Sequence, residues 1–160
     1  MALSLAERRE MIAKLQELPS MVEAAVAGLG EEQLDAPGGE GEWSVRQVVH
    51  HLADAHMNAF ARTKLVITEA KPILKPYDQE KWAELPDSTG VPIELSLSIL
   101  RGLHRRWAVL LQGLPEEAWR RQGVHLQNGL QALEDMLAIY VRHGDAHLEQ
   151  IAKIRRANGW

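Results

Sequence analysis

Cysteine is absent from the 160-residue sequence. Its absence excludes disulfides, thiolate metal ligands and a cysteine nucleophile. Any metal ion must therefore be bound through nitrogen and oxygen, and a site built from imidazoles suits zinc, nickel, iron, cobalt or copper rather than calcium. A chain without disulfides also suits a reducing compartment, and we expect a cytoplasmic protein.

An excess of positive charge and long apolar runs are also missing. The formal net charge is −4, and Lys and Arg occur singly or in short pairs, which argues against nucleic acid as the main partner. No apolar run approaches the ~18 residues needed to cross a bilayer. Charged AERRE lies so close to the start that we expect no signal peptide. We expect no membrane partner, and a single domain over residues 1–160.

Apolar residues recur with helical spacing along almost the whole chain. The pattern predicts four long helices, at about residues 4–29, 44–69, 93–111 and 130–156. There is no convincing strand pattern, so the predicted fold class is all-α: a four-helix bundle of antiparallel long helices. Pro19 predicts a kink or a break in the first helix. One long connection, from Lys71 to Pro92, joins helices 2 and 3, and connections of this length are uncommon unless they are functional.

The second helix has the clearest start signal. Ser44 is a good N-cap, and Gln47 stands three residues later, which together make a capping box. Trp43 and Val48 are placed to form the hydrophobic contact that often accompanies this cap. We therefore predict that the helix begins directly after Ser44.

Two histidines lie one turn apart on the last helix. His143 and His147 have the i, i+4 spacing that places both imidazoles on one face, and they share a sector with apolar residues that should face the core. A lone helical histidine is more often structural than a ligand. A buried pair, however, costs free energy unless it is hydrogen-bonded or ligated, and this favours metal binding. Gly144, next to the pair, would allow a neighbouring helix to approach closely.

His51 is a third candidate ligand, on the second helix. Gln47, Asp54, Asn58 and Arg62 fall within about 60° of it on a helical projection, flanked by apolar positions. Such a polar stripe suits a polar cavity, and it also suits an exposed face. For the remaining histidines we expect structural or solvated roles; they are His50, His56, His104 and His125.

Together His51, His143 and His147 can hold one divalent ion and leave coordination positions open, as catalytic sites do. Several other sites are excluded by sequence. No glutamate stands three residues before a histidine, so the Glu-x-x-His motif of di-iron bundles is missing. The HExxH, GxxxxGK[ST] and GxSxG motifs are missing as well.

Four segments resemble the YfiT-type branch of the DinB superfamily. They are WSVRQVVHHLADAHMNAF, PYDQEKW, LHRRWAVLL and IYVRHGDAHLEQI. The resemblance implies a metal-binding four-helix bundle that is regarded as a metal-dependent hydrolase, and some relatives are S-transferases that join a low-molecular-weight thiol, notably bacillithiol, to electrophiles. It implies as ligands the second histidine of HHLAD and both histidines of HxxxH, which are His51, His143 and His147. It further implies one zinc or nickel ion per chain, and often a homodimer.

The leading hypothesis from the sequence is a metal-dependent thiol S-transferase, whose substrates are a small thiol and an electrophile. Asp54 would orient the ligands, and Asn58 and Arg62 would bind an anionic part of the substrate. Tyr77, in the long connection, and Gln150, one turn beyond His147, are further candidates for orienting a ligand or contacting substrate. One alternative is a hydrolase that uses a metal-activated water. Another is a bundle that binds metal without catalysis.

Overall fold

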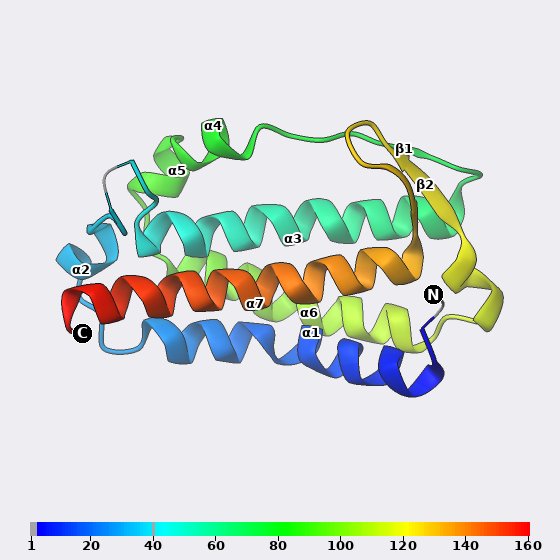
Figure 1. Ribbon diagram of the computed structural model, residues 1–160, viewed down its shortest axis with the longest axis horizontal. Helices are drawn as coiled ribbons and strands as arrows, with labels where there is room; N and C mark the ends of the chain where they lie inside the picture. The colour runs from blue at the N-terminus through cyan, green and yellow to red at the C-terminus, as the bar shows by residue number, and fades with distance from the viewer. Residues whose placement is uncertain (1–2, 40) are drawn as a thin grey trace.

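Four long helices dominate the computed structural model, which describes residues 3–39 and 41–160 (Figure 1). Shorter elements connect these helices. The helices are α1 (Leu5–Val26), α2 (Glu31–Asp35), α3 (Val45–Thr68), α4 (Gln79–Ala83), α5 (Pro86–Thr89), α6 (Glu94–Gln112) and α7 (Leu133–Asn158), with a 3₁₀ turn at Glu116–Arg120. The four-helix bundle predicted from the sequence is confirmed. No helix in the described residues is both long and apolar enough to cross a membrane.

The long connection determines how the helices are oriented. α1 packs against α6 and α7, and α3 packs against the same two helices. Because the chain crosses back over the bundle between α3 and α6, these two helices run in the same direction, opposite to α1 and α7 (Figure 1). The pairs α1/α6 and α3/α7 are therefore antiparallel, whereas α3/α6 and α1/α7 are parallel.

A small sheet, which the sequence pattern did not reveal, lies at one end of α3. Strand β1 (Ile73–Leu74) pairs in parallel with β2 (Gln122–His125), and β2 forms an antiparallel hairpin with β3 (Gly129–Ala132). Strands of two to four residues are too short to show a period-2 pattern. β1 lies within the long connection, as do α4 and α5, which pack on α3. The connection is therefore structured along the bundle rather than a free loop.

The start of α3 agrees with the predicted capping box. The Gln47 N–H donates to Ser44 Oγ at 3.2 Å, and the Ser44 N–H donates to Gln47 Oε1 at 3.0 Å. The Gln47 side-chain amide also donates to the carbonyl of Ala83 in α4. Arg46, almost fully buried, pairs with Asp35 and donates to the carbonyl of Val91. These contacts hold the start of α3 against α2, against the end of α4 and against the residues that follow α5.

Helix α1 is continuous through Pro19, so the alternative of a break there is wrong. The close approach predicted at Gly144 is confirmed, and the neighbouring helix is α1. A Cβ built on Gly144 would lie 2.7 Å from a methyl carbon of Leu18, whose side chain is buried. Glycine at this position therefore sets the distance between α1 and α7 next to His143.

Replacing Gly144 by alanine tests this close approach, with Gly102 as the matched control. Both glycines lie within long helices, so alanine adds helix propensity of about 1 kcal/mol at each site. A Cβ on Gly102 meets nothing within 4 Å, whereas one on Gly144 overlaps Leu18. We expect Gly102→Ala to raise the free energy of unfolding, measured in urea. The free energy of unfolding of Gly144→Ala should lie about 1–3 kcal/mol below that of Gly102→Ala. Equal free energies for the two variants would contradict the close approach.

Candidate metal centre

Three histidine side chains from two helices converge on one point. The Nε2 atom of His143, on α7, lies 3.2 Å from Nε2 of His51, on α3, and 3.2 Å from Nε2 of His147, on α7. Potential ligand atoms of all three residues lie within 4.8 Å of one another. His51 is buried and the other two are half-buried. The structure therefore brings together the three residues that the sequence predicted as ligands.

The spacing of these nitrogens suits a divalent ion. Zn–N bonds of about 2.0–2.1 Å at tetrahedral angles separate two nitrogens by about 3.3 Å. The Nδ1–H of His147 donates to Oε1 of Gln150 at 2.8 Å, because an amide oxygen only accepts. Neutral His147 consequently has a lone pair on Nε2, the atom that faces His143. The donor set thus has the geometry and the orientation that a bound cation requires.

Burial keeps the three imidazoles uncharged. Burial, with a smaller contribution from neighbouring imidazoles, lowers the pKa of His51 to about 3 and that of His143 to about 4. Burial also lowers the pKa of His147, against a smaller opposing effect of its hydrogen bond to Gln150. At neutral pH all three rings are therefore neutral, which is the form that binds a metal ion.

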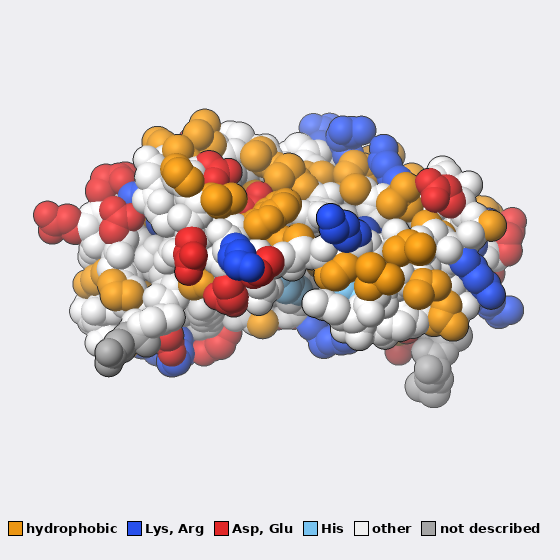
Figure 2. Space-filling model, turned by 90° about the horizontal axis from the view of Figure 1, so that it is seen from above, with side chains coloured by type: hydrophobic (Ala, Val, Ile, Leu, Met, Phe, Trp, Pro, Cys, Tyr) orange, Lys and Arg blue, Asp and Glu red, His pale blue; other side chains and the backbone are white. Residues whose placement is uncertain are grey.

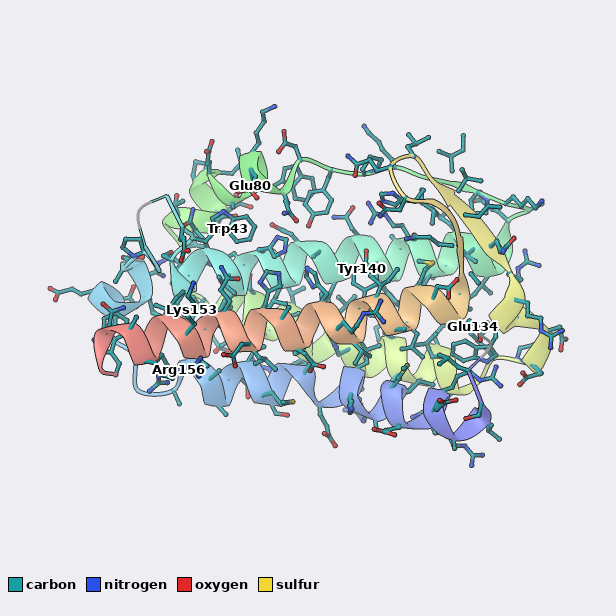
Figure 3. The ribbon with its side chains drawn as sticks, viewed as in Figure 1. Trp43, Glu80, Glu134, Tyr140, Lys153 and Arg156 are labelled. Atoms are coloured by element: carbon teal, nitrogen blue, oxygen red, sulfur yellow. The ribbon has the colours of Figure 1, made fainter. Side chains whose placement is uncertain are left out.

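Trp43 forms one wall of the site. Its ring centroid lies 4.7 Å from that of His51, and its indole N–H donates to Oε2 of Glu80 in α4 at 3.0 Å (Figure 3). The indole plane is nearly parallel to the His147 ring, with 9° between the planes. Trp43 therefore joins the long connection to the candidate metal centre, a role beyond the hydrophobic contact expected at the helix cap.

A small cavity adjoins His143 between α3, α7 and the segments that carry β1 and the β2–β3 hairpin. Its volume is about 200 Å³, and its polar lining includes Arg62, Tyr77, His125 and Tyr140. The Arg62 guanidinium donates to the Tyr140 hydroxyl at 3.1 Å and to the carbonyl of Lys75. Seen from above, histidine side chains are visible between the surrounding groups (Figure 2). His143 lines this cavity, so a small molecule in it can reach the His143 imidazole.

The other predicted site residues occupy different positions. Arg62 and Tyr77 line the cavity, and Gln150 binds His147. Asp54 is half-buried one turn beyond His51, and burial, with a smaller contribution from Asp87, raises its pKa to about 6. The Asn58 amide donates to the backbone carbonyl of Asp54 at 2.9 Å. The side-chain NH₂ group of Asn58 is therefore hydrogen-bonded to the backbone of its own helix.

His56 and His104 are fully buried and join a hydrogen-bonded network that the sequence analysis did not anticipate. His56 bonds to His143 at 3.1 Å and to His104 at 3.0 Å. A signal for the burial of His104 was available, since it occupies the apolar stripe of α6 formed by Leu97, Leu100, Trp107 and Leu111. His50 faces away, toward Ser96 and the carbonyl of Val91.

Comparisons with known proteins agree with this architecture. A curated relative from Geobacillus thermodenitrificans, named "Putative metal-dependent hydrolase", is 47% identical over 154 residues, which cover 95% of this chain and 86% of the relative. A relative of the same description from Oceanobacillus iheyensis is 43% identical and covers 94% and 87% of the two chains.

A solved structure of YfiT from Bacillus subtilis is similar throughout. It superposes with a TM-score of 0.96 at 39% sequence identity, covering 99% of this chain and 91% of YfiT, and it is described as having an unusual four-helix bundle topology. The family model described as DinB superfamily matches residues 14–151. The chain belongs to the DinB superfamily.

Proposed function

We propose that this protein is a divalent-metal-dependent hydrolase in which His51, His143 and His147 bind one zinc or nickel ion through their Nε2 atoms. The observation that carries the proposal is the convergence of three neutral imidazoles beside a polar cavity. The names of the relatives, as metal-dependent hydrolases, support this class of reaction.

The number of ligands favours catalysis over a purely structural ion. Structural zinc sites are filled by four protein ligands, whereas catalytic ones keep a position open. In the part of the chain that the structure describes, no fourth His, Asp or Glu belongs to the cluster. When bound, an ion held by three neutral ligands supplies Lewis acidity and lowers the pKa of water toward ~7.

Asp54 is the group that we propose as the proton acceptor. It follows His51 by one turn of α3, and its pKa of about 6 makes it a carboxylate at neutral pH that is still basic enough to take a proton. Tyr77 is near enough that the Asp54 charge helps to raise the pKa of its hydroxyl, after the larger effect of burial. Tyr77 therefore keeps its proton and can donate a hydrogen bond to substrate in the cavity.

The cavity suits a small substrate that carries an anionic group. Arg62 places positive charge in its lining, and the Tyr140 hydroxyl and the Lys75 carbonyl hold the guanidinium in position. A carboxylate of the substrate could pair with the guanidinium. The ester or amide carbonyl of the same substrate would then lie toward the imidazoles. We propose small anionic esters or amides as the substrate class.

Hydrolysis replaces thiol transfer as the leading hypothesis for two reasons. Asp54 offers a carboxylate base one turn of α3 from the ligand His51. In addition, no described feature of the cavity is specific for a thiol, and the relatives are named for hydrolysis. Thiol transfer through the same ligands is the competing outcome of the activity test below.

Metal binding is tested by a matched pair of adjacent histidines. We expect purified wild-type protein and His50→Ala to hold about one zinc or nickel ion per chain, because His50 faces Ser96. His51→Ala should lose the ion, since it removes one of three nitrogens. Metal analysis after dialysis against buffered metal gives the stoichiometry. A wild-type protein without metal, or a His51→Ala protein that keeps it, contradicts the ligand assignment.

Activity is tested with the nickel- and zinc-loaded protein on panels of small esters and amides without thiol. In parallel, it is incubated with bacillithiol and a chloro-nitrobenzene. We expect hydrolysis without thiol, faster for substrates with a carboxylate, and its loss on removal of the metal by a chelator. Conjugation that requires the thiol, together with no hydrolysis, would replace the proposed function by S-transfer.

The pH dependence tests Asp54. Its carboxyl is protonated below its pKa of about 6, so kcat/KM of the wild type should fall as pH drops through 6. His51 and His143 have pKa values of about 3 and 4, and so they remain neutral in this range. Asp54→Asn should lower kcat/KM by roughly 10²–10⁴-fold and remove the decline near pH 6. A variant that keeps this decline excludes Asp54 as the base.

A further inference from the structure

A row of hydrogen-bonded imidazoles leads from the candidate metal centre into the core. Nδ1 of His143 lies 3.1 Å from Nε2 of His56, and Nδ1 of His56 lies 3.0 Å from Nε2 of His104. Nδ1 of His104 bonds to the backbone carbonyl oxygen of Leu15. His56 and His104 are both 0% exposed. We refer to this row, from His143 to Leu15, as the histidine chain.

The carbonyl at its inner end determines where every proton in the histidine chain lies. A carbonyl oxygen only accepts, so the proton of His104 is on Nδ1. A fully buried imidazole without an acidic partner is neutral, which leaves Nε2 of His104 as an acceptor. His56 must then donate from Nδ1 and accept at Nε2, and His143 in turn donates from Nδ1. The one remaining lone pair of His143 is on Nε2, which faces His51 and His147.

We propose that His56 and His104 are positioning residues that hold His143 in the tautomer able to bind metal. This inference rests on the ligand set of the proposed function, and it assigns a role to two residues outside that set. Gln150 performs the same task for His147 with a single hydrogen bond. For His143 the same orientation is transmitted across two further rings, from a backbone carbonyl of another helix.

The histidine chain spans the whole bundle. Leu15 belongs to α1, His104 to α6, His56 to α3 and His143 to α7, so each long helix contributes one member. The orientation of a metal ligand thereby depends on the relative positions of all four helices. The histidine chain ends at the backbone carbonyl of Leu15, which has no proton to pass on and belongs to a residue buried in the core. It therefore orients His143 and does not carry protons to solvent.

Loss of the acceptor on His104 would reverse the direction of the remaining bonds. In His104→Leu, the Nδ1–H of His56 has no partner, and burying an unpaired donor costs free energy. His56 can avoid this cost by moving its proton to Nε2 and donating to Nδ1 of His143. His143 must then carry its own proton on Nε2, which blocks the atom that would bind the metal. His104→Gln keeps an acceptor, because its amide oxygen can replace Nε2.

The test compares His104→Leu and His104→Gln with wild type. His50→Leu is the matched control, since it removes another buried histidine that has two hydrogen bonds but lies outside the histidine chain. The first measurement is the Ni²⁺ dissociation constant, by competition with a chelator. The second is the ¹⁵N NMR spectrum of histidine-labelled, metal-free protein, which distinguishes Nδ1–H from Nε2–H tautomers.

In the metal-free wild type we expect His143, His56 and His104 to be protonated on Nδ1. His104→Leu should weaken Ni²⁺ binding by about 10–100-fold and move the His143 proton to Nε2. His104→Gln and His50→Leu should remain within about threefold of wild type, well below the loss typical when a hydrogen-bonding partner of a metal ligand is removed. A wild-type His143 protonated on Nε2 overturns the proposal, as does a folded His104→Leu that binds Ni²⁺ like wild type.

If His104→Leu does not fold, the wild-type tautomers and His104→Gln still decide the matter. The result is also separable from the hydrolase proposal, because neither measurement needs a substrate. Expected tautomers and affinities without hydrolysis would contradict the proposed reaction alone. Hydrolysis with His143 protonated on Nε2 in the metal-free protein would contradict the histidine chain alone.

Discussion

Antiparallel packing of α3 against α7 is the constraint on which the rest of the site depends. It places Nε2 of His51, on α3, 3.2 Å from Nε2 of His143, on α7. The capping box at Ser44 fixes where α3 begins, and Gly144 allows α1 to pack tightly on the other side of α7. Small changes in either helix position would separate the three nitrogens.

The core of this bundle contains buried histidines, and hydrogen bonds offset the cost of burying their polar rings. Buried imidazoles replace apolar side chains at core positions, and His56 and His104 each have a hydrogen-bonding partner on both ring nitrogens. The core therefore avoids the cost of unpaired polar groups while it keeps the rings neutral. This arrangement links the stability of the fold to the chemistry of the site, because the same hydrogen bonds connect the helices and orient a candidate ligand.

Much of the architecture could be predicted because its signals are local. Helical periodicity, the Ser44–Gln47 cap and the i, i+4 spacing of His143 and His147 each depend on neighbours within one or two turns. The short strands were missed because two to four residues carry no readable period, and the parallel orientation of α3 and α6 was missed because it depends on the path of a connection. The hydrogen bonds of His104 were not predicted, because the apolar stripe of α6 indicates that its side chain is buried but not which groups it meets.

The sequence by itself determined the four helices, the family resemblance and the choice of His51, His143 and His147 as candidate ligands. Only the tertiary structure decided which nitrogen of each ring faces its neighbours, and that His56 and His104 connect His143 to Leu15. The physical reason is that helical spacing fixes a side chain's face on its own helix. A hydrogen bond between residues 87 or 89 positions apart, in contrast, exists only after all four helices have packed.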